Sequence, residues 1–575
     1  MTKRGHHKEK VFGHKIVLEM VLCLFAISLV QTVTAQRGRG KGKTDERVYL
    51  VHSDELKHDA FGTNPDAQIV KGNVHFRHAG SHLWCDSAYY YQESNSFRAF
   101  GHVRFTQGDT LSLTCDRARY DGQNQMMEAR RNVVLRHRKQ TLRCDSLNYD
   151  RFYGNAYFFD GGELIDGNDR LTADWGQYNT ETREAEFYYN VRLTSPKHTI
   201  RTDTLYYDTR KSLAHVVGKY VSDGGRGTLK PSSIKSGTST IETENAYFDT
   251  KSDQANLYGR STIVDKMKTI AGDTLIHDKA TGYNRGRGNV IYVDRENKNE
   301  LHCEELVYNE VTGAGYATTN ALVKEYSQAD TLFMHADTLR IETFNIDTDS
   351  VYRKVHGYRN ARAYRTDVQA VCDSLVFSSL DTCMTMYKDP IAWNENRQLL
   401  GEEIKVYLND STVREARVLR QALSIERLDD LDHYNQVLAD SLVTFFEDGK
   451  VRRVVWTGNV RGIYYPVDDK DSTLMALNYM ETDTMRMFLS EERQLEKICT
   501  TAVKATYYPL TQIPPDKYKL KGFGWFEEVR PKDKNDIFRV AGKPDSQKLK
   551  SIDRPVIPLQ PKKGPRGVFN NPQGI

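Results

Sequence analysis

A cysteine followed by an acid recurs along the chain and has the groups needed for chemistry. The stretch "LRCDSLNYD" at 142–150 places Cys144, Asp145 and Ser146 side by side, and "LWCDSAYYY" (83–91) and "LTCDRARYD" (113–121) repeat its beginning. A thiol next to a carboxylate and a hydroxyl could hold a metal ion or act as a nucleophile with its base. The residues at the equivalent positions of the other segments show whether a reactive cysteine is required there.

The acid of this cluster marks a long internal repeat. Twelve segments align on it, and five of the eleven steps between successive acids are 29 residues. The residue before the acid is Cys in some units and Ala, Thr, Ser or Gly in others, so the position favours a small side chain, and Cys serves as a small hydrophobe. The aligned acids are Asp54, Asp86, Asp116, Asp145, Asp174, Asp203, Glu244, Asp273, Glu304, Asp337, Asp373 and Glu402.

We therefore interpret the acids as structural residues at a corner of the backbone, where carboxylates accept hydrogen bonds from turn amides. Two alternatives are a stacked carboxylate ladder that binds cations, and catalysis. A disulfide between Cys85, Cys115 or Cys144 of neighbouring units requires Cα atoms within about 7 Å. The acids that define the corner are Asp86, Asp116, Asp145, Asp174 and Asp203.

Each unit holds two extended segments. The second segment often carries a Gly-Asn-Val signature, as in "KGNVHF" (71–76) and "RGNVIY" (287–292). In the first segment Leu142 and Cys144 are spaced by two residues, and so are Leu147 and Tyr149, but the two pairs differ in parity. A plain strand cannot bury both pairs on one face, so the sequence predicts a bulge or corner at Asp145-Ser146.

The repeat predicts an all-β fold, a stacked-rung open β-jellyroll or solenoid built from about 29-residue units in one or two modules. The link at 413–440 fits a short helix or a strand equally well. The expected divisions are repeats at 48–220, a Gly/Ser/Thr-rich loop or joint at 221–240, a second set of repeats at 241–410, longer C-terminal β-repeats at 411–510, a C-terminal extension at 511–540, and a disordered Pro-rich and basic tail at 541–575.

The N-terminus predicts export. A basic segment at 1–15 precedes the apolar run "IVLEMVLCLFAISLV" (16–30), and Val33 and Ala35 fit a cleavage site. We interpret 1–35 as a signal peptide cleaved after Ala35 and 36–47 as a basic linker, with an uncleaved membrane anchor as the alternative.

Other chemistry has no support in the sequence. The chain contains no G-x-x-x-x-G-K-[ST] phosphate loop, no H-E-x-x-H zinc motif and no C-x-x-C pair. The net charge of +4 indicates no strong electrostatic partner, and no basic face with interleaved aromatic residues predicts nucleic-acid binding. We expect no catalytic residues, no metal and no cofactor.

The order and number of the units resemble the OstA/LptA family of periplasmic lipopolysaccharide-transport proteins. Units such as "LTCDRARYD" followed by "RRNVVL" (130–135) carry the resemblance, which spans roughly residues 47–510. It implies a twisted, partly open β-jellyroll with an apolar trough for the acyl chains of lipopolysaccharide. It also implies end strands that add to the jellyroll domains of inner- and outer-membrane partners, or to further copies head to tail.

On this basis we expect a non-enzymatic periplasmic carrier or bridge that moves lipopolysaccharide or lipid A toward the outer membrane. The alternatives are a structural or adhesive cell-surface β-solenoid and a carbohydrate-active β-helix enzyme. The expected trough residues are Leu83, Leu113, Leu142, Leu147, Leu171, Ile200 and Leu205.

Overall fold

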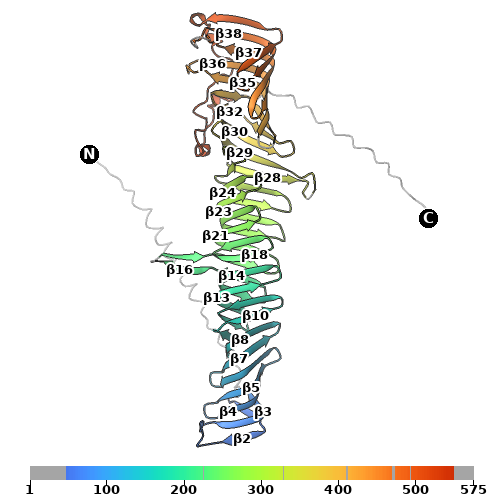
Figure 1. Ribbon diagram of the computed structural model, residues 1–575, viewed down its shortest axis with the longest axis vertical. Helices are drawn as coiled ribbons and strands as arrows, with labels where there is room; N and C mark the ends of the chain where they lie inside the picture. The colour runs from blue at the N-terminus through green and yellow to red at the C-terminus, as the bar shows by residue number, and fades with distance from the viewer. Residues whose placement is uncertain are drawn as a thin grey trace, which may run out of the picture. The chain divides into compact units, whose positions relative to one another are not determined.

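A computed structural model describes residues 47–549 apart from 224–225, 328, 347, 410–411, 431, 469–472 and 493. The predicted signal peptide, nearly all of the basic linker and residues 550–575 lie outside this range. The described chain consists of antiparallel strands with four short 3-10 turns and no α-helix, which confirms the all-β fold (Figure 1). It forms two compact units, unit 1 (1–167 with 175–182) and unit 2 (168–174 with 183–575).

Unit 1 is an antiparallel meander in which each long strand pairs with the next along the chain. Two short strands lie on its first long strand, and three shorter segments follow its last one. Its strands are β1 (Tyr49–His52), β2 (Glu55–His58), β3 (Gln68–His78), β4 (Ser81–Tyr91), β5 (Ser96–Gln107), β6 (Leu111–Asp121), β7 (Met126–His137), β8 (Gln140–Asp150), β9 (Asn155–Phe158), β10 (Gly162–Asp166) and β12 (Trp175–Asn179).

Unit 2 continues the same pattern, and several of its long strands are divided into two shorter ones at the bend. Its first half contains β11 (Asp169–Ala173), β13 (Glu184–Thr194), β14 (His198–Asp208), β15 (Leu213–Val217), β16 (Lys219–Asp223), β17 (Arg226–Lys230), β18 (Ser232–Ser236), β19 (Ser239–Thr243), β20 (Asn245–Asp249), β21 (Ala255–Asp265), β22 (Lys268–Asp278), β23 (Tyr283–Asp294), β24 (Asn299–Asn309), β25 (Ala314–Thr318) and β26 (Leu322–Glu325). Its second half contains β27 (Leu332–His335), β28 (Thr338–Phe344), β29 (Tyr352–Tyr364), β30 (Val368–Ser378), β31 (Cys383–Tyr387), β32 (Ile391–Asn394), β33 (Arg397–Leu400), β34 (Glu403–Asn409), β35 (Thr412–Arg427), β36 (Tyr434–Glu447), β37 (Lys450–Tyr464), β38 (Ala476–Leu489), β39 (Leu495–Thr500) and β40 (Lys504–Pro509).

The predicted phase shift is a β-bulge. Between β7 and β8 the pairing passes from Arg130↔Ser146 to Val133↔Cys144, so Arg131 and Asn132 together oppose Asp145 alone. The bulge was expected at Asp145-Ser146, and the structure places its extra residue on the neighbouring strand. Both bulge residues have left-handed backbone, and the same pair of positive φ values recurs at Gly72-Asn73, Gly101-His102, Tyr189-Asn190, Gly288-Asn289, Thr319-Asn320, Arg359-Asn360, Arg420-Gln421 and Gly458-Asn459.

The Gly-Asn-Val signature is therefore the sequence of this bulge. Gly and Asn tolerate left-handed backbone better than other residues, which explains why they recur at these two positions. The following Val, as at Val74 and Val290, returns to the buried face. Each 29-residue repeat is one pair of adjacent strands bent at its bulges.

Three segments differ from expectation. Residues 221–240, expected as a loop or joint, belong to the hairpin β16–β17, which projects from unit 2, and to β18 and β19 (Figure 1). The undecided link at 413–440 is strand, because it forms β35 and the start of β36. Residues 541–549, expected to be disordered, are described, and Lys543 donates to Asp389 at 2.6 Å.

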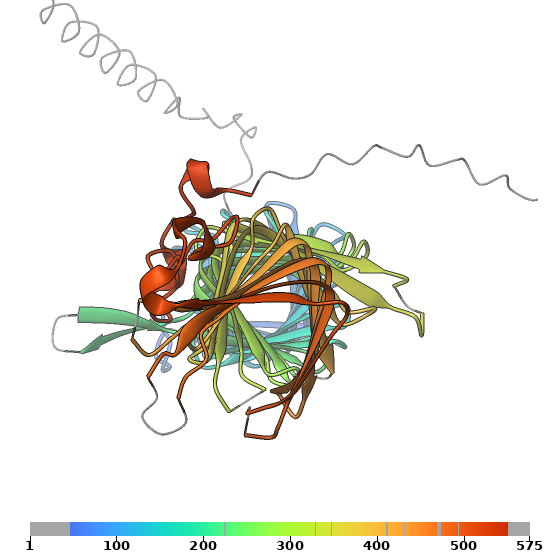
Figure 2. The ribbon, with the colours of Figure 1, turned by 90° about the horizontal axis from the view of Figure 1, so that it is seen from above.

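The C-terminal extension packs on the outside of the unit 2 strands, and Figure 2 shows it in red beyond their curve. We call residues 510–549 the strap; it includes η1 (Leu510–Gln512), η2 (Pro515–Lys517), η3 (Asp536–Phe538) and η4 (Asp545–Gln547). Buried Gln398 joins it to β33, since its amide donates to the Gly524 carbonyl at 2.7 Å and accepts from the Phe526 N–H at 2.9 Å. The apolar side chains that it covers with its own are Val371, Ile391, Trp393, Leu400, Leu423, Ile425 and Ile463.

We predict that Gly101→Ala loosens β4–β6 more than Gly108→Ala does. Both glycines have positive φ, but a Cβ at Gly101 would lie 2.2 Å from the Asp86 carboxylate, whereas nothing lies within 4 Å of one at Gly108. A positive φ costs Ala about 1 kcal/mol at either position. The difference between the two variants therefore reports the clash with Asp86. Hydrogen exchange of peptides spanning 81–121 measures the difference, which we expect to be about tenfold or more in protection. Equal losses would show that the carboxylate does not fill this site.

Candidate functional site

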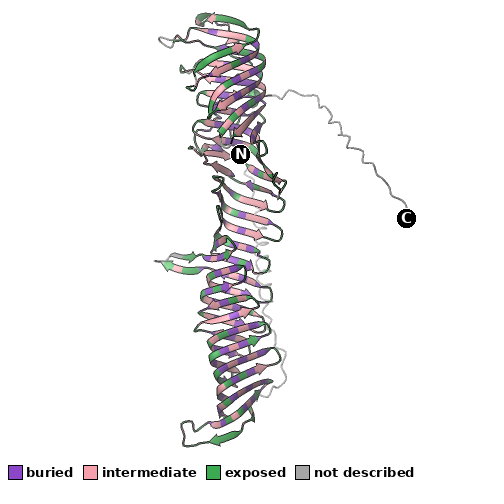
Figure 3. Ribbon diagram, turned by 45° about the vertical axis from the view of Figure 1, so that its right-hand side comes forward, coloured by how far each residue is buried: buried purple, intermediate pink, exposed green. Residues whose placement is uncertain are grey.

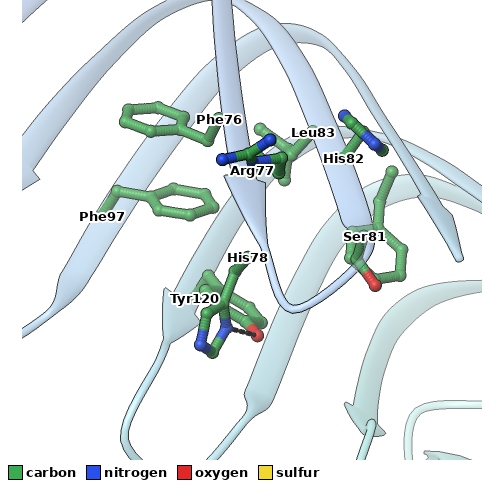
Figure 4. Close-up of a pocket in the computed structure, with 9 residues that line it drawn as sticks. Phe76, Arg77, His78, Ser81, His82, Leu83, Phe97 and Tyr120 are labelled. Atoms are coloured by element: carbon green, nitrogen blue, oxygen red, sulfur yellow. Dashed lines mark hydrogen bonds between the residues drawn. The ribbon is translucent and has the colours of Figure 1, made fainter. Parts of the chain in front are cut away.

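The expected trough residues lie on the inward face and are fully buried. In unit 1 Leu83, Leu113, Leu142 and Leu147 are at most 2% exposed. Leu83 lines a pocket of about 10 Å³ in which Phe76 and Phe97 stack with ring centroids 4.4 Å apart (Figure 4). Such a volume holds about one water molecule. At these positions the side chains pack into the interior of unit 1.

The remaining expected trough residues belong to unit 2 and are equally covered. Leu171, Ile200 and Leu205 are 0% exposed. Their partners across the strands, such as Leu193 opposite both Leu171 and Ile200 and Phe187 opposite Leu205, are also buried apolar side chains. These residues form the core of the first strands of unit 2.

The corner acids lie on the outer face. Each acid opposes the bulge of one neighbouring strand and lies beside the bulge of the strand on its other side, as Asp116 does with the bulges of β5 and β7. Asp116 and Asp174 accept hydrogen bonds from the side-chain amides of Asn132 (2.9 Å) and Asn190 (2.6 Å). Asp86 has His102 Nδ1 at 2.8 Å, and this hydrogen bond raises the pKa of His102. The donors are thus side chains of the second bulge residue, not the turn amides that the sequence suggested, because the acids lie within strands.

The other two corner acids occupy the same register position with different surroundings. Asp145 is exposed opposite the bulge of β7, and Asp203 is half-buried and accepts from Thr204 Oγ1 at 3.4 Å. In the described part of the chain no group of three or more His, Cys, Asp or Glu is arranged to hold a metal ion.

Five of the described cysteines are buried, and Cys144 and Cys499 are half-buried. All seven in the described chain are free, so the structure contains no disulfide between Cys85, Cys115 and Cys144. Burial raises the pKa of each of these three thiols to about 12, and it does the same for Cys303 and Cys372. A thiol that keeps its proton at neutral pH is a poor nucleophile and metal ligand. The cluster that looked reactive in the sequence therefore combines a protonated, half-buried thiol with an exposed acid on the outer face.

In unit 1 the two ends of the bent strands meet. A straight strand of eleven residues is roughly 36 Å long, yet His78 at the end of β3 lies 2.7 Å from the hydroxyl of Tyr120 at the opposite edge of β6. We call the row of strand ends that includes the Ala79-Gly80 turn the first edge, and the row that includes the turn at 122–125 the second edge. The seam is the line along which these two rows of strand ends meet. The same kind of bond joins Gln107 to Tyr149 at 3.1 Å and His137 to Tyr178 at 2.9 Å.

The first strands of unit 2 are closed in the same way. Tyr207 at the second edge donates to Asp169 at the first edge at 3.0 Å. Buried His198 forms an ion pair with Asp253, which also accepts from Lys279 Nζ at 2.9 Å. Burial alone would raise the pKa of Asp253, but Lys279 and His198 hold it below its usual range. Polar groups therefore close the seam of these strands.

From β22 to β30 the strand ends are bonded differently. We call residues 268–378 the open stretch. In its described residues hydrogen bonds run along one edge, as from Arg295 Nη1 to Thr269 (2.9 Å) or from Asn309 Nδ2 to the Thr281 carbonyl (3.0 Å), and none joins the two edges.

Many inward apolar side chains of the open stretch are half-buried, although Leu275, Val290 and Leu339 are buried. Figure 3 shows many residues of intermediate burial in this part of unit 2. The half-buried side chains pack beside a central row of small buried residues such as Cys303, Ala336 and Ala361. Beyond the stretch the inward face is buried again at Met386 and Ile404. The half-buried set includes Ile270, Leu301, Val323 and Met334 toward the first edge and Leu306, Tyr308, Ile341, Val355 and Phe377 toward the second.

The comparison with protein families agrees with this architecture. Residues 45–203 match the model of a family described as OstA-like protein. This part of the chain is OstA-like. Over these residues the match supports the OstA/LptA-like resemblance that the repeats suggest. No curated protein matches the chain.

The open stretch lies beyond the OstA-like match but has the same construction. Asp273 accepts from the side chain of Asn289 at 2.9 Å, as Asp116 does from Asn132. The sequence marks Ile270 and Leu301 as members of the apolar repeat, but it carries no sign that they are less covered than Leu142. None of the helical turns in the described chain is long and apolar enough to cross a membrane.

We predict that Tyr120→Phe opens the unit 1 seam. It removes the hydroxyl beside His78 and leaves a buried imidazole nitrogen without that partner, at a cost of about 1–2 kcal/mol. Exchange of the amides at the ends of β3 and β6 should rise by about tenfold. Tyr89→Phe is the control, since Tyr89 contacts Phe100 through its ring only. If both variants exchange alike, the seam bond contributes nothing.

Proposed function

We propose that the protein is a non-enzymatic periplasmic carrier or bridge that moves lipopolysaccharide toward the outer membrane. In this proposal the acyl chains lie against the inward apolar side chains of the open stretch. One observation supports it most: many of the inward aliphatic and aromatic side chains between Ile270 and Phe377 are only partly buried. Ordinary cores do not leave such a set in contact with water.

The energetics suit a lipid. Each CH₂ transferred from water to an apolar surface contributes about 0.8 kcal/mol, so a chain lying along several strands gains several kcal/mol. The neighbouring strands are 4.7–4.9 Å apart in any sheet, and inward side chains repeat at that spacing. A flexible acyl chain can therefore shift from one strand to the next while its contacts stay similar.

Two features support a proposed location and proposed partners: the signal peptide expected at 1–35 and the terminal strands. The signal peptide expected at 1–35 supports a periplasmic place, with or without association with the outer membrane. Among the described residues, β1 and β2 of unit 1 pair only with β3, and β39 and β40 of unit 2 pair only with β38. Unpaired strand edges accept further strands. Jellyroll domains of inner- and outer-membrane partners, or another copy of the chain, would add there.

A structural β-solenoid remains the second candidate, because the strands of unit 1 have a filled core. It requires no lipid and gives no role to the half-buried set of the open stretch. A carbohydrate-active enzyme requires a pair of carboxylates at a substrate site, whereas the regular acids here are bonded to bulge side chains.

We predict that a photo-crosslinking amino acid at Leu301 captures lipopolysaccharide in the exported protein and that one at Leu142 does not. Leu301 is half-buried in the open stretch, whereas Leu142 is 1% exposed at the equivalent repeat position. Mass spectrometry of the adduct identifies the lipid. Leu306 serves as a second position in case the change at Leu301 disturbs folding. Absence of lipid at Leu301 and Leu306, in protein that remains folded by circular dichroism, would contradict the proposed function.

A further inference from the structure

We infer that the outer face of β13, β14 and β15 is a binding site for an uncharged sugar ring. The site is a hollow of about 180 Å³, on the face of these strands opposite the buried Leu205. The inference goes beyond the proposed function and does not depend on it. The residues that line the hollow are Glu184, Ala185, Glu186, Tyr206, Tyr207, Asp208, Leu213 and His215.

The strand register places two rows of outward side chains around the hollow. Residues two apart on a strand point to the same face, and directly opposed residues of neighbouring antiparallel strands lie side by side. The first row consists of Glu186, Tyr206 and His215, and the second row, two residues nearer the second edge, consists of Glu184, Asp208 and Leu213.

The rings of the first row are held in place by their neighbours. The imidazole of His215 stacks on Tyr206 with ring centroids 5.5 Å apart and on Tyr247 of β20 with centroids 4.2 Å apart. Its Nε2–H donates to Asn245 Oδ1 at 3.0 Å. A side chain that is already fixed loses little conformational entropy when a ligand packs against it. Tyr206 and His215 are half-buried, so they offer a preformed apolar surface to the C–H groups of a sugar.

The acidic groups of the hollow are fixed acceptors of hydrogen bonds. Glu186 Oε2 accepts from the Tyr188 hydroxyl at 3.0 Å. Asp208 Oδ1 accepts from the backbone N–H groups of Arg210 (2.8 Å) and Lys211 (3.2 Å). Burial alone would raise the pKa of Asp208, but these bonds and the two cations hold it below its usual range. Ionised carboxylates accept hydrogen bonds and donate none, so the ligand must bring the donors.

The charges around the hollow favour a ligand without charge. The described residues that line it include three carboxylates and no Lys or Arg, so an anion would meet like charge. A cation would compete with Arg210 and Lys211, which already pair with Glu184 at 3.6 Å and with Asp208 at 3.5 Å. A wholly apolar ligand would leave the acceptors without partners. A sugar has hydroxyl donors for the carboxylates and C–H faces for the rings, and small-ligand sites usually combine such surfaces.

The dimensions suit one sugar ring and allow more. The volume of the hollow equals that of about six water molecules in the liquid. Beyond His215, aromatic side chains continue across the next two strands with Tyr247 and Tyr258, which are 39% and 42% exposed. Neighbouring strands are 4.7–4.9 Å apart in any sheet, close to the length of one sugar unit. We therefore expect a trisaccharide to contact these tyrosines and to bind more tightly than its monosaccharide.

Calorimetric titration of the full exported chain with N-acetylglucosamine and its β-linked trimer tests the site. Tyr206→Ala should weaken binding of the trimer roughly tenfold or more, whereas Tyr206→Phe keeps the ring and should change it less than about threefold. Tyr316→Ala is the matched control, because it removes a 39% exposed tyrosine of β25 that does not line the hollow. If Tyr206→Ala disturbs β14 in hydrogen exchange, Leu213→Arg fills the hollow instead and should cause the same loss.

Two further titrations identify the source of the sugar. One uses soluble glycan strands of peptidoglycan, and the other uses the lipid-free oligosaccharide of lipopolysaccharide. Binding of either one that depends on Tyr206 supports the site and names its source. No binding of any probe at millimolar concentration would overturn the inference, and so would equal losses in Tyr206→Ala and Tyr316→Ala. Lipid capture at Leu301 is measured separately, so a negative result here leaves the proposed function intact.

Discussion

The paired left-handed residues of each bulge are the constraint on which the structure depends. A regular strand is nearly straight, and a stack of straight strands would be an open sheet with two exposed faces. One extra residue opposite the acid bends the long strands at the same place, and the next strand can follow only if it bends there too. The acid completes the bend, because its carboxylate fills the space beside a Gly such as Gly101 or binds an Asn such as Asn132. Repetition of this one local geometry turns a meander into a curved stack with an inside.

Bending brings the strand ends together, and the residues at those ends then decide whether the inside is sealed. In unit 1 a histidine or glutamine at one edge meets a tyrosine from the other, and both polar groups are satisfied while their rings add to the core. At the corresponding position four residues after the acid, the open stretch has His277, Tyr308, Ile341 and Phe377, and His277 bonds to Asn284 along its own edge. Ile341 and Phe377 cannot form such bonds. Sealed and open stretches therefore share one backbone plan and differ in the chemistry of their edges.

The sequence predicts the parts of this plan that are local. The 29-residue period, the small residue before the acid, and the opposite parity of Leu142 and Leu147 all follow from side-chain alternation, and the structure agrees with each. The parity shift alone could not show that the bulge has its extra residue on the neighbouring strand. Nor could it show that Leu142 is sealed while Leu301 is half-exposed, because that depends on strands two or three positions away. The strap was similarly hidden: Gln398 and Gln436 read as ordinary polar strand residues, but both bind backbone groups more than 80 residues further along.

An exposed apolar interior is normally a hazard, since it invites aggregation. Here the hazard is confined by the elements on each side. The closed strands at the start of unit 2 supply paired backbone to β22, and the strap holds β29 and the strands after it. In a repeat array each unit is stabilised largely by its neighbours, so a poorly buried stretch can persist between well-buried ones. The chain can thus keep a half-wet apolar surface in register without a core of its own at that point. That arrangement suits reversible contact with an acyl chain better than either a sealed core or an unsupported open sheet would.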